Sequence, residues 1–340
     1  MTALVTGSNG FLGSRLVRRL VAEGESAPIC LVRPGSNTSR LEKLSQEVPG
    51  ARIRLRKGDL GTVEGAQRAL EEADVVYHLA ACLRGAPAEM FLNTVVTSAN
   101  LLRAAIRRSR PPRFVLVSSF SVYGVADLPA HSVLTEETPI EPTPTRRDLY
   151  CQVKWRQEQL FWQYHREHGL DVMVLRPGAI FGPESYGISV RVGLELPGLF
   201  LFLGGDNILP LSYVDNCADA LALAGTSGFR SGHVINVHDD DLPTCRTFLH
   251  RYRREVRDLR VVSLPYAATL ALSCANQRYS EVSRGQLPAI FTLYKTRSAW
   301  KPMRYDNSRL HQLGWSQRIS TEDALGETFQ RHREYWRRNR

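Results

Sequence analysis

The chain has 340 residues, of which 43% are apolar and 23% charged, and this composition excludes a disordered or fibrous protein. Lysine and arginine outnumber aspartate and glutamate by 44 to 34, which gives a net charge of +10. The basic residues are scattered and no nucleic-acid-binding motif accompanies them, so we expect no nucleic-acid partner. Solvated helix ends are the main explanation for the excess, with attraction of a phosphorylated cofactor or substrate as the alternative.

The six cysteines lack the spacing of a metal site or a disulfide framework, so we expect free thiols in a reducing compartment. The nine histidines show no HxxxH or HxH spacing, and we expect no metal. The N-terminus enters a strand directly, without a secretory signal, and the apolar runs 196–203 and 264–275 are too short for a bilayer, which needs about 20 residues. These features predict a cytoplasmic protein with no membrane partner.

Short β-branched segments alternate with amphipathic ones along the first half of the chain. Strands are predicted at 2–5, 29–32, 52–55, 75–79, 114–117, 172–175 and 234–237, and helices at 12–23, 40–46, 63–72, 87–108, 146–168 and 321–337. Such alternation implies right-handed crossovers and a parallel sheet covered by helices on both faces. We therefore predict an α/β fold, a Rossmann-type doubly wound parallel sheet.

The regular alternation ends near Gly182, after which Gly and Pro punctuate apolar segments. We expect residues 1–182 to form a dinucleotide-binding domain. Residues 183–340 should form mainly a smaller C-terminal substrate-binding cap, with some segments returning to the first domain.

A glycine-rich turn with the spacing GxxGxxG joins the first strand to the first helix. Glycines there permit a tight turn, close approach of the backbone to a pyrophosphate and close packing of helix on strand. The helix N-terminus adds free N–H groups and a positive dipole. A glycine turn alone is a weak signal, but its place between strand and helix supports the assignment. We predict that a dinucleotide binds here, at Gly7, Ser8, Asn9, Gly10, Phe11, Leu12 and Gly13.

The residue that ends the second strand predicts which dinucleotide binds. Enzymes that prefer NAD carry an acidic residue about 20 residues after the glycine turn. This chain has Arg33, whose guanidinium can bind a 2′-phosphate through paired hydrogen bonds. Ser36, Asn37 and Arg40 in the following loop could add donors. We therefore predict that NADP(H) is preferred and NAD(H) possible, while a surface arginine is the alternative interpretation.

Tyr150 and Lys154 stand at positions i and i+4, on one face of a predicted helix. A YxxxK sequence often marks only a solvated helix face. This one follows the fifth strand, which ends in Val117-Ser118-Ser119. A phenol with an ordinary pKa of about 10 is a poor base near neutrality, and a nearby cation would favour its ionised form.

Together these motifs resemble the extended short-chain dehydrogenase/reductase family, which includes nucleotide-sugar epimerases and dehydratases, 3β-hydroxysteroid dehydrogenases and dihydroflavonol reductases. The resemblance covers nearly the whole chain. Its further elements are Gly58-Asp59-Leu60, Tyr77-His78-Leu79-Ala80-Ala81, Asn93, Leu175-Arg176-Pro177-Gly178, Tyr213-Val214-Asp215-Asn216 and Leu313-Gly314-Trp315. The combination is specific to the family but not to one activity.

The resemblance implies roles for three catalytic residues. Tyr150 would be the general acid/base, and Ser119 would hydrogen-bond the reacting oxygen. Lys154 would hold the nicotinamide ribose and lower the pKa of the phenol. Ser118 is the competing serine, although Ser119 fits the family register better, and Tyr123 is expected to be structural.

The resemblance also implies binding contacts and an assembly. Further cofactor contacts would come from Asp59, Leu60, Ala80, Ala81, Tyr150, Lys154 and Pro177. Substrate contacts would come from Ser121 and Ala179. Family members commonly dimerise through the helix before Ser119 and the helix that carries Tyr150, so we expect a homodimer.

Departures from the family pattern bear on the substrate. Leu149 and Val153 replace the usual neighbours of the catalytic pair without removing a reacting group. Residues 210–212 are Pro-Leu-Ser, where many nucleotide-sugar enzymes carry an arginine that binds the substrate diphosphate. That absence weakens the nucleotide-sugar hypothesis, although Arg191 could substitute.

The sequence therefore predicts an NADP(H)-dependent oxidoreductase that interconverts a carbonyl and a secondary alcohol on a fairly apolar small molecule. The apolar segment 194–203 would line its pocket or, equally, belong to the core of the cap. The alternative is a nucleotide-sugar epimerase or dehydratase with tightly bound NAD(P). A dinucleotide-binding sensor without turnover is a third hypothesis, against which the intact Ser, Tyr and Lys argue.

Overall fold

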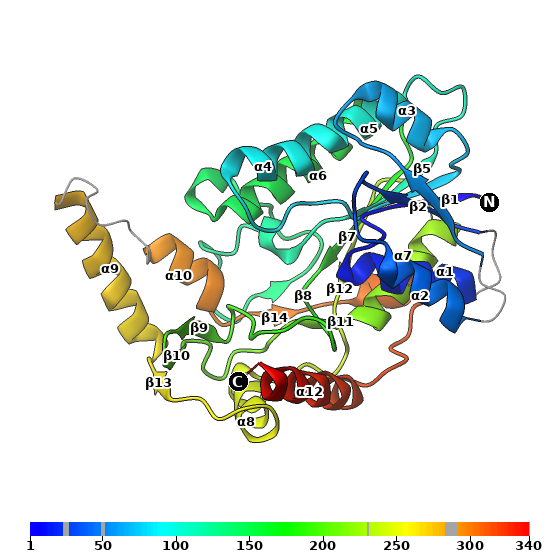
Figure 1. The fold of residues 1–340 in the computed structure, drawn as a ribbon. Coiled ribbons are helices and arrows are strands. Elements are labelled where there is room, and N and C mark those ends of the chain that lie inside the picture. The colour runs from blue at the N-terminus through cyan, green and yellow to red at the C-terminus, as the bar shows by residue number, and fades with distance from the viewer. Residues whose placement is uncertain (23–26, 49–51, 230, 283–291, 340) are drawn as a thin grey trace.

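The computed structural model describes residues 1–22, 27–48, 52–229, 231–282 and 292–339. Its centre is a seven-stranded parallel sheet in the order β12-β7-β5-β4-β1-β2-β3 (Figure 1). The strands are β1 (Ala3–Thr6), β2 (Ile29–Val32), β3 (Arg54–Lys57), β4 (Val75–His78), β5 (Arg113–Val117), β7 (Val172–Pro177) and β12 (His233–Val237). The predicted doubly wound α/β fold is confirmed, and the strand order reverses between β1 and β4, where such folds bind ligands.

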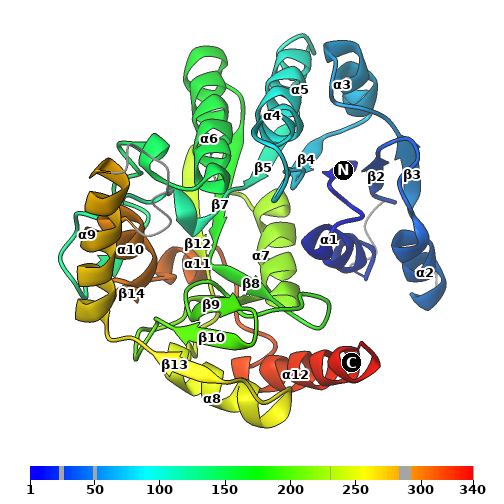
Figure 2. The ribbon, with the colours of Figure 1, turned by 60° about the vertical axis from the view of Figure 1, so that its left-hand side comes forward.

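Helices cover both faces of the sheet. Figure 2 shows α3, α5 and α6 on one face and α1 and α7 on the other. Their bounds are α1 (Phe11–Ala22), α2 (Ser39–Glu47), α3 (Val63–Leu70), α5 (Thr97–Ala105), α6 (Leu149–His168) and α7 (Val214–Thr226). Successive strand residues belong to opposite cores, as Leu4 and Val5 of β1 do. Both faces are therefore apolar along the inner strands, which explains why β1, β2 and β5 are continuous hydrophobic runs, whereas the edge strand β3 is largely charged and exposed.

The helix with Tyr150 begins three residues later than predicted, at Leu149 instead of 146. Asp148 caps it, its carboxylate accepting from the Cys151 N–H at 3.0 Å, while residues 144–146 form a separate 3₁₀ turn. Gly169 ends the helix with φ of 68°, a conformation that favours glycine. The cap fixes the first turn, in which Tyr150 lies.

The single helix predicted over 87–108 is wrong in detail. The segment divides into α4 (Pro87–Phe91), a π-helical turn (Leu92–Val96) and α5. Within the turn, the Thr94 hydroxyl accepts from the Cys82 N–H at 2.9 Å, and the Thr94 carbonyl accepts from the Ser98 hydroxyl at 2.5 Å. The Ser98 side chain thus takes up a backbone carbonyl of the turn, and π turns of this kind are frequent at functional sites.

Smaller boundary differences have simple causes. Strand β7 continues through Arg176 to Pro177, although the sequence predicted its end at 175, because β12 pairs with it up to Val237 opposite Pro177. The third strand lies at 54–57 instead of 52–55, set by its pairing with β2. Glu23, the predicted end of the first helix, lies outside the described residues.

The second half of the chain builds small sheets and helices beside the main sheet (Figure 1). The strand pairs are β8 (Ala179–Phe181) with β11 (Leu211–Tyr213), β6 (Val133–Leu134) with β14 (Arg304–Tyr305), and β10 (Leu199–Phe202) with both β9 (Gly193–Leu196) and β13 (Val261–Ser263). The helices are α8 (Cys245–Glu255), α9 (Tyr266–Val282), α10 (Leu293–Trp300), α11 (Ser308–Gln312) and α12 (Thr321–Arg338). Strand β12 and helix α7 come from this half yet belong to the main sheet layers, while the division at residue 182 stays a prediction. Within the described part of the chain, no helix combines the length and apolar character needed to cross a membrane.

Candidate active site

The three predicted catalytic side chains come together where β5 meets α6. Ser119 follows β5 and caps a short 3₁₀ turn, its hydroxyl accepting from the Ser121 N–H at 3.1 Å. The half-buried Tyr150 shares a side-chain hydrogen bond with Ser119. Lys154, one turn further along α6, is buried with 3% of its surface exposed. The arrangement can pass a proton between a phenol and an oxygen held by the serine.

The pKa of Tyr150 differs from the value that the sequence led us to expect. We expected Lys154 to lower the pKa of the phenol, but burial raises the pKa of Tyr150 and only the Ser119 hydrogen bond opposes that rise. Lys154 instead donates to the Val117 carbonyl and the Gln157 side chain, each at 2.6 Å. Burial lowers the pKa of Lys154 itself to about 7. In the cofactor-free protein both groups are therefore shifted toward their neutral forms.

Ser118, the competing serine, points to a different site. Its hydroxyl donates to the Glu158 carboxylate at 2.5 Å. Glu158 forms a buried ion pair with Arg176, whose guanidinium lies 4.5 Å from the centre of the Tyr123 ring. The Tyr123 hydroxyl donates to the Asn236 side chain at 2.6 Å. Ser118 and Tyr123 thus belong to a structural network behind the catalytic face.

The glycine turn has the shape that a dinucleotide requires. Gly7 has φ of 69°, and a Cβ there would lie 3.0 Å from the Ala80 backbone nitrogen. A Cβ on Gly13 would lie 2.1 Å from the Gly7 carbonyl oxygen. Only glycine permits the helix to start this close to the strand. The turn also leaves the buried side-chain oxygen of Asn9 without a hydrogen-bond partner among the described residues. The residues present therefore fit a dinucleotide, which would offer a donor to that oxygen.

The residues predicted to choose between NADP and NAD have different surroundings. Arg33 is exposed directly after β2, and its side chain has no hydrogen bond or ion pair within the described ranges. Arg40 was expected in the loop but lies in the first turn of α2, because the helix starts at Ser39. It forms a 2.5 Å ion pair with Glu184, and Asn37 accepts a hydrogen bond from Asn9 through its backbone oxygen. Among the described residues near this turn, Arg33 thus carries an exposed guanidinium without an ion pair.

The other predicted cofactor residues follow the ends of neighbouring strands. Asp59 is exposed after β3, and its carboxylate accepts from the Gly61 N–H at 2.9 Å. Leu60 is buried beside it. Ala80 and Ala81 follow β4, and the Ala80 N–H donates to the Thr6 hydroxyl at 3.2 Å. All four lie at the carboxyl ends of strands adjacent to β1 or β2, the edge at which such sheets bind ligands.

Pro177 and the predicted substrate residue Ala179 lie at the end of β7, whereas Ser121, the other predicted substrate residue, lies in the 3₁₀ turn after β5. Pro177 ends that strand, and Ala179 begins β8, its N–H donating to the Pro210 carbonyl at 2.7 Å. The Ser121 hydroxyl is buried and has no hydrogen-bond partner among the described residues. A buried hydroxyl without a partner is costly, so a bound molecule that supplied one would be stabilised there.

Residues 210–212, where many nucleotide-sugar enzymes carry an arginine, are buried. Ser212 is buried and donates to the Val237 carbonyl at 2.6 Å. Arg191 is half-buried, and no carboxylate pairs with it in the described chain. It donates to the Tyr305 hydroxyl at 3.4 Å, and the Tyr305 ring stacks on Phe120 at 5.7 Å. Because Phe120 adjoins Ser119, Arg191 is connected to the catalytic turn.

The apolar segment 194–203 forms most of the β9–β10 hairpin. Phe200 and Phe202 are buried in the main core, whereas Leu196 has 45% of its surface exposed. Phe200 and Phe202 therefore belong to the core and do not line a substrate pocket.

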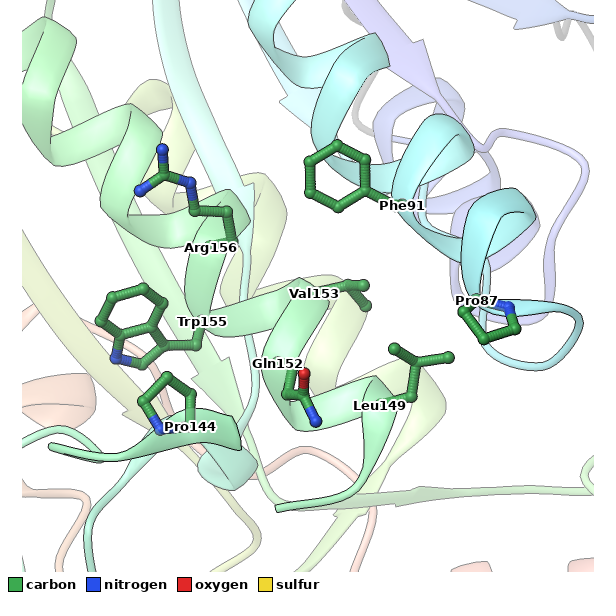
Figure 3. A pocket seen from close by; sticks show the side chains of 8 residues that line it. All are labelled: Pro87, Phe91, Pro144, Leu149, Gln152, Val153, Trp155 and Arg156. Carbon is green, nitrogen blue, oxygen red and sulfur yellow. The ribbon is translucent and has the colours of Figure 1, made fainter. Parts of the chain in front are cut away.

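An apolar groove of about 370 Å³ lies between α4 and α6 (Figure 3). Its lining includes Phe91 from α4 and Leu149 and Val153 from α6. On α6 these side chains are offset from Tyr150 and Lys154 around the helix axis. The groove is thus a separate surface from the candidate active site.

Sequence reasoning missed two buried residues beside the catalytic group: Gln157, which contacts Lys154, and Ser98, which contacts Gln157. Gln157 accepts from Lys154 and donates to Ser98 at 2.9 Å. The i+3 spacing from Lys154 was a possible signal for Gln157, but Ser98 lies on a different helix and gave none.

The chain belongs to the NAD dependent epimerase/dehydratase family, whose model matches residues 3–237. It is 31% identical over 260 residues to a dTDP-glucose 4,6-dehydratase from Streptomyces antibioticus, covering 70% of this chain and 72% of that enzyme. It is 25% identical over 343 residues to a trifunctional UDP-glucose 4,6-dehydratase/UDP-4-keto-6-deoxy-D-glucose 3,5-epimerase/UDP-4-keto-L-rhamnose-reductase from Arabidopsis thaliana. That match covers 96% of this chain but 46% of the plant protein, so the chain spans about half the length of that relative.

The fold is also that of a solved UDP-glucuronic acid 4-epimerase from Bacillus cereus in complex with NAD. The two chains superpose with a TM-score of 0.72 at 19% identity, covering 99% of this chain and 100% of the epimerase. The protein is thus an enzyme of the extended short-chain dehydrogenase/reductase type. These relatives support the epimerase or dehydratase hypothesis better than the small-molecule oxidoreductase that the sequence placed first.

Proposed function

We propose that this enzyme carries out an epimerase or dehydratase reaction on a nucleotide-linked sugar and retains its dinucleotide through the cycle. The observation that carries the proposal is the placement of Ser119, Tyr150 and Lys154 where β5 meets α6, together with a glycine turn shaped for a dinucleotide. Relatives that act on UDP- and dTDP-linked sugars support the substrate class. A bound nicotinamide would supply a reversible hydride acceptor.

In this proposal Ser119 orients a sugar hydroxyl, and Tyr150 exchanges the proton of that hydroxyl as hydride leaves the same carbon. Burial keeps the Tyr150 phenol protonated in the empty protein, so a nearby charge must favour its ionised form during turnover. The Lys154 ammonium, joined by the cationic nicotinamide, would provide that charge. Ser121, whose buried hydroxyl lacks a partner among the described residues, would bind a second group of the substrate.

Arg191 is our candidate for recognising the substrate phosphates. It is half-buried, unpaired with any carboxylate of the described chain, and connected to the catalytic turn through Tyr305. A guanidinium in such a place favours an anionic ligand. Many nucleotide-sugar enzymes bind the substrate diphosphate with an arginine in the segment that corresponds to residues 210–212. Ser212 cannot do so, because it is buried against β12, and Arg191 would bind the phosphates instead.

We propose NADP(H) as the preferred cofactor, with NAD(H) as the alternative. Support comes from Arg33, which follows β2 where an NAD enzyme carries an acid and whose guanidinium has no partner among the described residues. We also propose a cytoplasmic enzyme, since its six cysteines are free thiols.

We further propose a homodimer that buries the groove between α4 and α6. Phe91 has 47% of its surface exposed and Leu92 54%, and an apolar surface of this kind is stabilised by a partner. The groove lies on the two helices through which we expected the dimer to form.

The test begins with the purified enzyme and no added cofactor. Retained dinucleotide is released by denaturation and identified, and UDP-glucose, dTDP-glucose and UDP-glucuronic acid are then offered separately. Conversion of a sugar nucleotide without net consumption of NADPH or NADH supports the proposal. Turnover only of ketones or apolar secondary alcohols, with stoichiometric cofactor consumption, would instead establish the oxidoreductase alternative, which the absence of an arginine at residues 210–212 favours.

A further inference from the structure

A chain of hydrogen-bonded, buried polar side chains connects Lys154 to the glycine turn. Lys154 Nζ donates to Gln157 Oε1 at 2.6 Å, and Gln157 Nε2 donates to Ser98 Oγ at 2.9 Å. Ser98 Oγ lies 2.8 Å from His78 Nε2, and His78 Nδ1 lies 2.8 Å from Thr6 Oγ1. All five residues are buried. The chain joins the candidate catalytic lysine to the residue that precedes Gly7.

The direction of each hydrogen bond on the lysine side follows from donor and acceptor counts. An ammonium only donates, so the Gln157 atom that faces Lys154 must be its oxygen. Ser98 has one hydroxyl proton, which it donates to the Thr94 carbonyl at 2.5 Å. Ser98 Oγ must therefore accept from Gln157. It must also accept from His78, which carries its proton on Nε2.

The directions of the hydrogen bonds between His78, Thr6 and Ala80 are then determined as well. His78 Nδ1 has no proton and accepts from the Thr6 hydroxyl, whose oxygen accepts from the Ala80 N–H at 3.2 Å. Burial lowers the pKa of His78 to about 3, so the ring stays neutral at physiological pH. The Gln157 amide also donates to the Ala80 carbonyl at 3.3 Å. The same network thus orients both backbone groups of Ala80 beside the proposed cofactor path.

We propose that Gln157 and Ser98 are positioning residues for Lys154. Ser98 holds the Gln157 amide in one orientation, and Gln157 in turn gives the buried ammonium a fixed acceptor. The Val117 carbonyl takes a second N–H of Lys154 at 2.6 Å, which leaves the third N–H for the ribose and Tyr150. This role depends on the proposed function of Lys154 in the reaction, but the hydrogen-bonded chain itself does not.

The network has a consequence for the charge of the lysine. Burial disfavours the ammonium, whereas the nearby Glu158 carboxylate favours it. Acceptors that replace water restore a further part of its stability. Removal of the Gln157 oxygen should therefore lower the pKa of Lys154 below its value of about 7 in the cofactor-free protein. The lysine would then lose its charge at a lower pH than in the wild type.

The test compares the wild type with Gln157→Leu and Ser98→Ala. Gln163→Leu is a matched control, because Gln163 lies on the same helix but is exposed and donates to Glu167 at 3.1 Å. The titration of Lys154 is followed by NMR in the cofactor-free protein with carbon-13 in lysine, assigned with Lys154→Arg. In Gln157→Leu its midpoint should fall by about 1 to 2 in pH, the loss of one hydrogen bond to a charge. Gln163→Leu should leave it unchanged.

Ser98→Ala keeps the proposal testable if Gln157→Leu does not fold. Without the Ser98 oxygen, the His78 Nε2–H loses its acceptor, so the nitrogen-15 shifts of the ring should move from the Nε2–H form toward the Nδ1–H form. NADPH affinity, measured by fluorescence, should also weaken in both variants. A folded Gln157→Leu protein with an unmoved Lys154 titration, or a Ser98→Ala protein with an unchanged His78 tautomer, would overturn the proposal. Full turnover by Lys154→Ala would instead contradict the proposed function while leaving the network intact.

Discussion

Glu158→Gln should destabilise the enzyme strongly, because Glu158 is the centre of a buried charged cluster. Its carboxylate pairs with Arg176, and the two side chains have 1% and 4% of their surface exposed. It also accepts from the Ser118 hydroxyl at 2.5 Å and the Trp162 indole at 3.1 Å. The substitution preserves shape and one acceptor oxygen but removes the charge that neutralises the guanidinium.

The size of the effect follows from that burial. Arg176 donates two hydrogen bonds to the carboxylate, one of them from Nε at 3.1 Å. Breaking a buried ion pair by removing one partner costs about 3 to 5 kcal/mol in the free energy of unfolding. Because glutamine keeps one acceptor oxygen, we expect Glu158→Gln to fall near the lower end of this range, at about 3 kcal/mol. Glu72→Gln is the control, because Glu72 and Arg54 form an ion pair with 45% of each side chain exposed, and such pairs contribute little.

The loss in free energy of unfolding caused by Glu158→Gln should also depend on pH. Burial alone would raise the pKa of Glu158, but the Arg176 charge and the hydrogen bonds outweigh it and hold the pKa below its ordinary value. A lowered carboxyl pKa stabilises the protein above its unfolded-state value, about 4.3, and this stability is lost as pH falls through the folded-state value. The difference between wild type and Glu158→Gln should therefore narrow below about pH 4.

Urea denaturation at pH 7 and about pH 3 measures both effects, with the midpoint and slope of each curve compared between variants. Equal midpoints for Glu158→Gln and Glu72→Gln at pH 7 would refute the reasoning, because burial would then make no difference. A difference from wild type that did not narrow at the lower pH would contradict the assigned charge.

Three further predictions concern the site and the assembly. Tyr150→Phe should reduce turnover of the identified substrate about 10²- to 10⁴-fold while NADPH affinity, measured by fluorescence titration, changes little; retained turnover would exclude the tyrosine as acid/base. Arg33→Asp should erase an NADPH preference of about ten- to a hundredfold, the equivalent of one charge-assisted contact of about 1.5 to 3 kcal/mol, when both cofactors are titrated at fixed salt. Equal wild-type affinities would make Arg33 an ordinary surface residue. Phe91→Glu should dissociate the dimer in sedimentation velocity, whereas Leu272→Glu, at an exposed position on α9, should not. A wild type that sediments as a monomer would rule the dimer out.

The sequence by itself determined the layered fold and the glycine turn. Strand and helix periodicities are local, so the alternation from β1 to β7 could be predicted without tertiary contacts. The strand and helix beside the turn likewise identified Gly7 and Gly13 as sites of close backbone approach, which the structure reproduces. The placement of Tyr150 and Lys154 one turn apart on the same helix followed from helical spacing alone.

Tertiary structure decided which side chains act together. Ser118 and Ser119 are neighbours in sequence, but only the packing of α6 on β5 directs the first to Glu158 and the second to Tyr150. Ser98 reaches Gln157 across 59 residues of sequence. The pKa of Tyr150 rises instead of falling, because burial outweighs its hydrogen bond with Ser119. Contacts between distant segments and the loss of solvent around them leave no periodic pattern in the sequence, so they became visible only in the folded chain.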